Sequence, residues 1–313
     1  MDKLRAYEVF VAVVDRGSFA RAADALDTSP ANVTRYVNDL EAELGTRLLN
    51  RTSRRLSLTD SGQGLVDRAR LFLEDVADAE AFVTDTGAKP RGRLRINAPL
   101  SFGILHLSHL WPDFMARYPE IDLEVALSDR IVDLVDEGYD LAIRISRAGA
   151  PSYVARKLCV SRNLLCASPD YLKTHGVPGQ PQDLVGHRAI LNMHSPMPEQ
   201  WVFTAADGRE TGVRPQAVMR VNNGETARAA MLAGIGLNWQ PSFLIGPDVA
   251  AGRLVHLMPD YRLPDIDVLA VYPSRRHLSA KVRVMIDFLS AAFHGAPPWE
   301  LGHQNRAVSH EPK

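Results

Sequence analysis

The sequence contains little cysteine and no long hydrophobic run. Only Cys159 and Cys166 occur among its 313 residues, which is typical of a reducing compartment and leaves no cysteine-based metal site. No apolar stretch reaches the ~20 residues of a membrane span. Asp15 and Arg16 follow the apolar part of the N-terminus, where a signal peptide would carry a small-residue cleavage site. We therefore expect a cytoplasmic protein with no membrane partner.

Neither sign of charge dominates, and the common catalytic motifs are missing. There are 36 Lys and Arg against 37 Asp and Glu, for a formal net charge of -1. A neutral chain can still bind nucleic acid through a local basic patch. The chain has no GxSxG, P-loop, HExxH or glycine-rich dinucleotide turn. His106 and His109 are three residues apart with no third ligand nearby. We expect no enzyme, no cofactor and no metal site.

Positive charge is concentrated in one short segment, residues 47–62. It reads RLLNRTSRRLSLTDSG and holds four arginines before its first acid, Asp60. Leu48, Leu56 and Leu58 are spaced to anchor a short hairpin, or wing, on a core. The arginines and polar residues between them would then project towards DNA phosphates or a minor groove.

Three short amphipathic helices are expected before this segment. Apolar spacing predicts a helix over residues 3–15, a second helix after the N-cap Ser18, and a third that begins at Ser29 and Pro30. A short helix, a tight turn and a third helix in this order indicate a helix-turn-helix. Outward polar residues near the start of the third helix, and Tyr36 with them, can reach base edges or phosphates; a solvated helix face is the alternative. The candidate DNA-binding residues are Ser29, Pro30, Asn32, Thr34, Arg35, Asn38, Arg51, Thr52, Arg54 and Arg55.

Residues 9–62 resemble the winged helix-turn-helix of LysR-type transcriptional regulators. The resemblance is carried by GSFARAADAL, LEAELGTRLLNR and LTDSG. It implies a homo-oligomeric regulator of transcription that binds double-stranded DNA, has a C-terminal effector domain, and has RNA polymerase as a further candidate partner. Asn32, Thr34 and Tyr36 depart from the residues more usual in the family, which affects the preferred operator sequence.

A proline-free stretch from Asp60 to Thr86 predicts one long helix. Apolar or small residues recur along it at alternating spacings of four and three, which is a heptad seam. Such a seam favours pairing with a partner helix, so that a dimer reads two half-sites of an interrupted palindromic operator; a single helix lying on a domain is the alternative. The family resemblance implies the same dimerisation helix and favours tetramers. The seam residues are Leu58, Gly62, Leu65, Ala69, Phe72, Val76, Ala79 and Val83.

From Gly92 onward, strand-like and helix-like segments alternate, which predicts a largely parallel sheet. Strands are expected near 94–98, 121–127 and 141–145, and helices at 101–117 and 131–137. A second block begins near Leu164, and the last strand and helix return to the first. The phrases DLVDEGYDLAIR and NNGETARAAMLAGIGL resemble the family's effector domain, which is similar to periplasmic binding proteins.

The predicted fold class is therefore an α+β winged helix-turn-helix, a long linker helix, and an α/β effector domain of two subdomains. The expected boundaries are 1–59 for the DNA-binding domain, 60–90 for the linker helix and hinge, and 91–296 for the effector domain. Subdomain I covers about 91–163 and 267–296, subdomain II covers about 164–266, and a flexible tail covers 297–313.

Ligands of open α/β folds bind beyond the carboxyl ends of strands, at helix N-termini. Ser101 and the pair Asn222 and Asn223 stand at two such places. Arg144 would supply a counter-charge to a carboxylate, and Phe102 and Trp201 would supply apolar walls. We expect a small-molecule effector that is an organic acid or an aromatic compound. Each residue also has a plain structural reading: the polar ones as helix caps, Arg144 as a surface ion pair, and Trp201 as core.

Redox sensing is the alternative function. Cys159 and Cys166 are seven residues apart, and some members of the family sense peroxide through two cysteines. Cys166, however, stands in the apolar run Leu164–Ala167, where a buried thiol behaves as a small hydrophobe.

Overall fold

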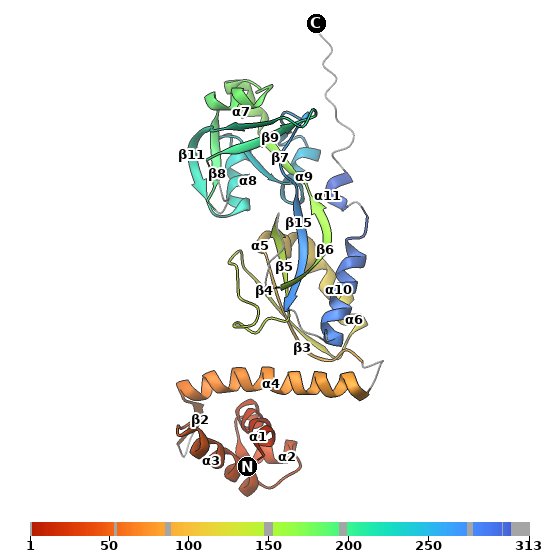
Figure 1. The fold of residues 1–313 in the computed structure, drawn as a ribbon. Helices are drawn as coiled ribbons and strands as arrows, with labels where there is room; N and C mark the ends of the chain where they lie inside the picture. Colours follow the sequence, from red (N-terminus) through yellow and green to blue (C-terminus); the bar gives the residue numbers. More distant parts are fainter. Residues whose placement is uncertain are drawn as a thin grey trace. The chain divides into compact units, whose positions relative to one another are not determined.

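The computed structural model describes residues 2–52, 55–84, 89–146, 153–193, 199–273, 278–295 and 297–301. The chain divides into two compact units, Met1–Lys89 and Pro90–Lys313 (Figure 1). Within the described ranges, no helix combines the length and the apolar character that crossing a bilayer requires. The two units are described in turn.

Three capped helices build the first unit. These are α1 (Lys3–Arg16), α2 (Phe19–Ala25) and α3 (Pro30–Leu44). The side chains of Asp2, Ser18 and Ser29 accept hydrogen bonds from the first turns of the three helices, as N-caps do. The apolar faces meet in a core of Ala6, Val9, Phe10, Val13, Ala22, Ala23, Val33, Val37, Leu40, Leu48, Leu49 and Val66.

The basic segment forms the predicted hairpin. Strands β1 (Leu49–Thr52) and β2 (Arg55–Leu58) pair antiparallel, with Leu49 opposite Leu58. Glu41 on α3 fixes the start of this wing, because its Oε1 accepts hydrogen bonds from the backbone N–H groups of Leu48 and Leu49 at 2.8 and 3.0 Å. Leu56 and Leu58 pack against the core.

Helix α4 (Asp60–Thr84) uses the first part of the predicted seam within its own unit. Of the seam residues, Leu65 packs against the helical core and Ala69 is 4% exposed; Val66, beside the seam, is fully buried in that core. The ring of Phe72 meets Tyr7 of α1 edge to face, with 6.1 Å between centroids, yet Phe72 remains 49% exposed. The helix-on-a-domain alternative therefore describes the N-terminal half of α4. The side chains of Ala79 and Val83, and residues 85–88 of the expected hinge, lie outside the described residues.

A five-stranded sheet forms subdomain I, in the order β4-β3-β5-β15-β6. Strand β3 runs parallel to β4 and β5, whereas β15 runs antiparallel to β5 and β6, so the sheet is only partly parallel. Helices α6 and α10 lie together on one side of it (Figure 1), where Phe114 contacts Phe288. The bounds are β3 (Gly92–Ala98), β4 (Ile121–Leu127), β5 (Leu141–Ser146), β6 (Tyr153–Ser161), β15 (Ile266–Pro273), α6 (Trp111–Arg117) and α10 (Ala280–Ala292).

Two predicted helices of subdomain I differ from expectation. The helix expected at 101–117 is irregular: α5 (Leu100–Phe102), a π-helical turn η1 (Gly103–Leu107) and a 3₁₀ turn η2 (Ser108–Leu110) precede α6. The helix expected at 131–137 is wrong. Asp133 Oδ1 accepts hydrogen bonds from Val135 N and Asp136 N, and such local bonds compete with helix formation. Ile131 in that loop is 85% exposed.

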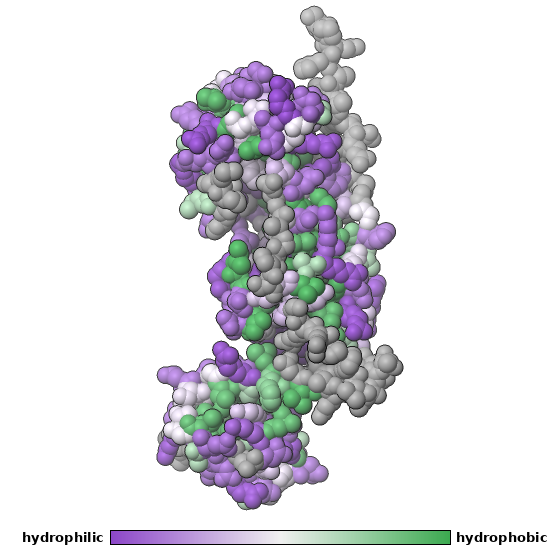
Figure 2. Space-filling view, in the orientation of Figure 1, coloured by the Kyte–Doolittle hydropathy of each residue, from purple (hydrophilic) through white to green (hydrophobic). Residues whose placement is uncertain are grey.

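Subdomain II contains three small sheets, β12-β7-β13, β11-β8 and β10-β9-β14. Hydrophilic side chains predominate on its visible face (Figure 2), while Tyr171, Phe203 and Leu184 are buried inside. The sequence does not predict β6, β9, β10, β13 or β14. The bounds are β7 (Asn163–Ala167), β8 (Arg188–Asn192), β9 (Trp201–Ala205), β10 (Glu210–Val213), β11 (Gln216–Val221), β12 (Asn238–Pro241), β13 (Val255–His256), β14 (Tyr261–Arg262), α7 (Pro169–His175), η3 (Pro181–Gly186), α8 (Gly224–Leu232) and α9 (Ser242–Ala250).

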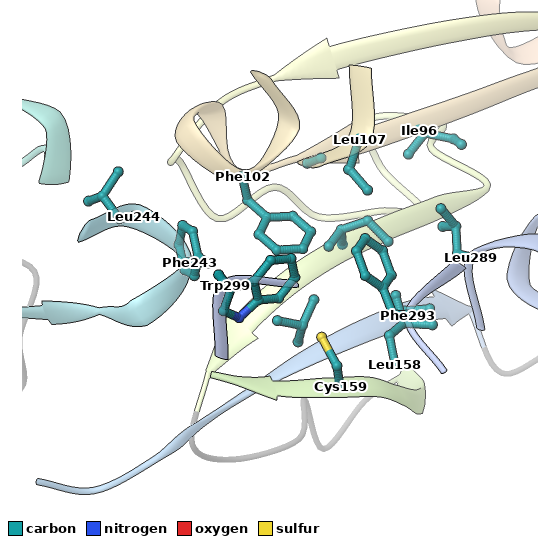
Figure 3. Close-up of a cluster of buried hydrophobic side chains, with 14 of the residues drawn as sticks. Ile96, Phe102, Leu107, Leu158, Cys159, Phe243, Leu244, Leu289, Phe293 and Trp299 are labelled. Carbon is teal, nitrogen blue, oxygen red and sulfur yellow. The ribbon is translucent and has the colours of Figure 1, made fainter. Parts of the chain in front are cut away.

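The chain passes between the subdomains twice. Arg162 joins β6 to β7, and residues 263–265 join β14 to β15. Asn163 Nδ2 donates to the carbonyl oxygen of Pro264 at 2.7 Å, which ties the two crossings together. One apolar cluster continues through this junction, with Phe102 from subdomain I and Phe243 from subdomain II in contact (Figure 3).

The expectation of a flexible tail from residue 297 is wrong for its first residues. Helix α11 (Pro298–Leu301) is packed on the protein, and Trp299 is only 6% exposed. Apart from Phe293, the aromatic side chains around Trp299 are remote in sequence, so local periodicity does not indicate its burial. Residues 302–313 lie outside the described residues.

Candidate nucleic-acid interface and ligand site

The N-terminal turn of α3 presents the polar residues that the sequence singled out. Ser29 Oγ accepts a hydrogen bond from Asn32 N at 3.2 Å, and Pro30 occupies the first turn. Asn32, Arg35 and Asn38 are exposed on the side away from Val33 and Val37. Exposed amide and guanidinium groups on a helix bounded by a turn are suited to base edges and phosphates.

Two neighbouring residues on α3, Thr34 and Tyr36, are less exposed to a DNA partner than the sequence predicts. Thr34 is half-buried, and its hydroxyl donates to the carbonyl oxygen of Pro30 at 2.9 Å. Tyr36 does not project outward but packs against the helical core, and the Arg35 guanidinium lies 5.6 Å from the centroid of its ring. Tyr36 therefore supports the position of Arg35.

The wing follows α3 in the chain and carries the other candidate DNA-binding residues. The backbones of Arg51, Thr52 and Arg55 belong to the hairpin strands, and their side chains lie outside the described residues, as Arg54 does entirely. Hydrogen bonds of Thr59 secure the base of the wing: its hydroxyl donates to Arg47 O at 2.7 Å and accepts from Gly62 N at 3.0 Å. The end of the hairpin is thus fixed to the start of α4.

Arg144 lies at the carboxyl edge of the parallel strands in subdomain I. The register pairs Asn97 with Ala142, so Arg144 is level with Pro99, just beyond the end of β3. In the described part of the chain, its guanidinium donates to two neutral oxygens, Asn97 Oδ1 at 2.7 Å and Val132 O at 3.2 Å. Burial lowers the pKa of Arg144 from its ordinary value. A half-buried cation on neutral acceptors is favourably placed for an anionic ligand.

Asp129, which the sequence reading did not single out, connects the two predicted ligand sites. Its Oδ1 accepts a hydrogen bond from Leu100 N at 3.0 Å, and its Oδ2 accepts one from Asn223 Nδ2 at 3.3 Å. Asn223 caps α8, accepting from Glu225 N and Thr226 N. The structure therefore brings the start of α5 and the start of α8 to one carboxylate. Asn222, the residue before Asn223, is exposed.

Three candidate ligand residues have other positions than expected. Ser101 does not cap its helix, because α5 begins at Leu100 and its first N–H is bound by Asp129. Phe102 is fully buried, and Trp201 is 3% exposed. Phe102 lies in the core that joins the subdomains and Trp201 in the core of subdomain II, so neither forms a pocket wall.

The histidine and cysteine candidates also lie in packed surroundings. His106 Nε2 is 2.9 Å from the carbonyl oxygen of Phe243, and its ring lies tilted against that of Trp299. No group of three or more potential metal ligands occurs among the residues that the structure describes. Burial raises the pKa of the Cys159 thiol to about 12 and raises that of Cys166 as well. Both thiols are buried, which does not favour the redox alternative.

Comparison with known protein families identifies both units of the chain. Residues 4–63 match the model of the bacterial regulatory helix-turn-helix protein, lysR family, and residues 87–294 match that of the LysR substrate binding domain. The chain therefore belongs to the LysR family of transcriptional regulators, with a DNA-binding helix-turn-helix and an effector-binding domain.

Individual relatives of known sequence or structure are similar to this chain over nearly its whole length. A helix-turn-helix transcriptional repressor of Pseudomonas aeruginosa is 36% identical over 312 residues, which cover 96% of this chain and 95% of the relative. The structure of CrgA, a LysR-type regulator from Neisseria meningitidis, superimposes with a TM-score of 0.59 at 32% identity, covering 93% of this chain and 99% of CrgA. The full-length structure of the Vibrio cholerae virulence activator AphB gives a TM-score of 0.57 at 28% identity, covering 92% and 99%.

Proposed function

We propose that this regulator acts in the cytoplasm and binds an interrupted palindromic operator, with α3 in the major groove of each half-site. The observation that carries the proposal is that α3 has one buried apolar face and one exposed polar face. Val33, Val37 and Leu40 are fully buried, whereas Asn32, Arg35 and Asn38 are exposed. Arg51, Arg54 and Arg55 of the wing would bind the flanking backbone or minor groove.

The proposed binding species is a dimer, and dimers pair into tetramers. The outer part of α4 supports this: Phe72 lies on the heptad seam and remains 49% exposed after packing on Tyr7. A second α4 would cover that ring, as apolar seams do in paired helices. Two winged domains joined in this way would read two half-sites.

The proposed effector is a small organic acid that binds at the carboxyl edge of subdomain I. Arg144 supports this, because its half-buried guanidinium is satisfied by neutral oxygens that a carboxylate would outcompete. Asn223 and Ser101 lie around the same junction between subdomains. The aromatic alternative loses support because Phe102 and Trp201 are committed to cores.

The DNA proposal is tested by selecting bound sequences from randomised double-stranded DNA with the full-length protein. The selected sites should contain two half-sites, and protection should cover both. Arg54→Ala should weaken binding to all sequences and reduce the dependence of affinity on salt, because one phosphate contact is lost. Arg209→Ala provides the control, since Arg209 is an exposed arginine of subdomain II paired with Asp207. An unchanged salt dependence in Arg54→Ala would contradict the wing assignment.

The effector proposal is tested by thermal stabilisation against aliphatic and aromatic carboxylates. A ligand that binds the native state raises the melting temperature by mass action. The shift should disappear in Arg144→Gln and persist in Arg156→Gln, whose guanidinium lies on the same sheet but pairs with Asp287 at 2.8 Å. A carboxylate that stabilises both variants equally would place the site elsewhere.

A further inference from the structure

Trp299 of α11 is inserted where the two subdomains meet. Its ring lies 5.9 Å from that of Phe102 and 4.3 Å from that of His106, both in subdomain I. The ring of Phe243, the second residue of α9 in subdomain II, lies 6.4 Å away (Figure 3). One indole therefore contacts aromatic side chains of both subdomains.

Glu300, the next residue, binds the chain crossing itself. Its Oε1 accepts a hydrogen bond from Arg162 N at 3.1 Å, and its Oε2 accepts one from Arg162 Nε at 2.5 Å. Ser242 Oγ donates to the same carboxylate. Arg162 joins β6 to β7, and Ser242 begins α9, so Glu300 holds the crossing and subdomain II together.

The surroundings of Glu300 are extensively hydrogen-bonded. Ser242 N donates to Arg162 O at 2.7 Å, and the hydroxyls of Ser161 and Ser242 lie 2.8 Å apart. Burial acts to raise the pKa of Glu300, but the bonds from Ser242 and Arg162 outweigh it and lower the pKa below its ordinary value. The carboxylate is thus ionised and bound at neutral pH, and charge-assisted hydrogen bonds of this kind are stronger than neutral ones.

We infer that residues 297–301 form a C-terminal strap that sets the angle between the two subdomains. Trp299 packs beside the direct contact of Phe102 with Phe243, and Glu300 holds the crossing at Arg162. A reorientation that moves Phe102 away from Phe243 cannot keep both aromatic contacts of Trp299, so the strap must shift or detach when it occurs. The strap therefore regulates how readily the effector domain changes arrangement. With the proposed effector bound near Arg144, such a change is the means by which binding would alter the DNA-binding domains.

The angle is measured by pulsed electron-spin distance measurements on the full-length chain. Ala116→Cys on α6 and Lys173→Cys on α7 are exposed positions on helices of different subdomains. The native thiols are both buried, so the spin label attaches to the two introduced ones. Doubly labelled chains are diluted in excess unlabelled protein, which leaves only distances within one chain.

Trp299→Ala, Glu300→Gln and a chain that ends after Gly295 should each broaden the distance distribution at least two-fold. A chain that ends after Leu301 keeps the strap and should match the parent. Trp111→Ala is the control for lost aromatic packing, because Trp111 packs on the same core within subdomain I. It should lower the melting temperature and leave the distribution unchanged.

An unchanged distribution in Trp299→Ala and Glu300→Gln would overturn the inference. Equal broadening in Trp111→Ala would also overturn it, because general loosening would then be the cause. Glu300→Gln keeps the size of the side chain, so it decides the question if the shortened chain does not fold. The measurement uses neither operator nor effector, so its failure would leave the proposed function untouched.

Discussion

Asp129 and Asn223 join the two subdomains at the edge where the parallel strands end. Asn223 Nδ2 donates to Asp129 Oδ2 at 3.3 Å, while the other oxygen of the same carboxylate accepts from Leu100 N. Asn223 also caps α8 through its own side-chain oxygen. A single carboxylate and a single amide thus connect two helix starts that are far apart in the sequence.

The substitution Asn223→Asp should keep the cap of α8 and remove the hydrogen bond to Asp129. Aspartate caps helices as well as asparagine does, but here it would replace the amide donor with a second carboxylate facing Asp129. We expect a loss of a few tenths of a kcal/mol in the free energy of unfolding, larger at low salt. Asp129→Asn in the same chain should restore it. Denaturant unfolding at two salt concentrations measures both, and a double variant no more stable than Asn223→Asp would contradict the connection.

Two glycines of α4 should respond oppositely to alanine. A Cβ at Gly62 would lie 2.0 Å from Leu48 O, whereas one at Gly64 meets nothing within 4 Å. Gly62→Ala must displace either the helix or the wing and should cost about 1–3 kcal/mol, as overpacking does. Gly64→Ala should gain about 0.5–1 kcal/mol from the higher helix propensity of alanine. Thermal unfolding of the two variants provides the comparison, and equal melting temperatures would show that α4 is not held against Leu48.

His106 should make stability depend on pH on the acid side of neutrality. Burial lowers its pKa from 6.5, the hydrogen bond with Phe243 O opposes this, and the charge of His109 adds to the lowering. Below pH 6.5 the unfolded chain takes up a proton that the native state does not yet bind. The free energy of unfolding is therefore unaffected above that pH and falls below it, by at most about 1.4 kcal/mol per pH unit.

The matched variant for this effect is His106→Gln, which keeps a side-chain donor for Phe243 O and removes the titration. Burial also lowers the pKa of His187, so the informative quantity is the difference between parent and variant. Urea unfolding between pH 5 and 8 should show a steeper acid loss in the parent. Parallel curves would indicate that His106 titrates as it does in the unfolded chain.

The two cysteines should not react while the protein is folded. Burial raises the pKa of Cys159 to about 12 and also raises that of Cys166, so the thiolate needed for attack is scarce at neutral pH. A chromogenic disulfide reagent should detect no thiol in the native protein and both thiols in denaturant. Rapid native reaction at either cysteine, removed by Cys159→Ser or Cys166→Ser, would revive the redox alternative.

Local signals explain which parts of the fold could be predicted from sequence. The winged helix-turn-helix could be predicted, because its helices have regular apolar spacing and short connections. Ser18 and Ser29 cap two of these helices. The loop at 131–137 could not be, because Asp133 binds backbone N–H groups that a helix would have used.

The candidate ligand site depended on contacts that sequence does not encode locally. Ser101 was expected to cap its helix, but the group that binds Leu100 N is the side chain of Asp129, on another strand's loop. Phe102 and Trp299 are 197 positions apart in the numbering, and their rings pack 5.9 Å apart. Only the folded chain brings them together, so the sequence predicts a flexible tail where the strap forms.

The double crossing between the subdomains also orders events during synthesis. Subdomain II, from Asn163 to Arg262, is one continuous stretch and is complete when its last strand leaves the ribosome. In subdomain I, β6 pairs with β15 alone among the described strands, and β15 begins only at Ile266. An edge without its neighbour is open to wrong pairing. Translation of subdomain I therefore begins first but is completed after that of subdomain II. About a hundred residues are synthesised between β6 and its partner strand β15.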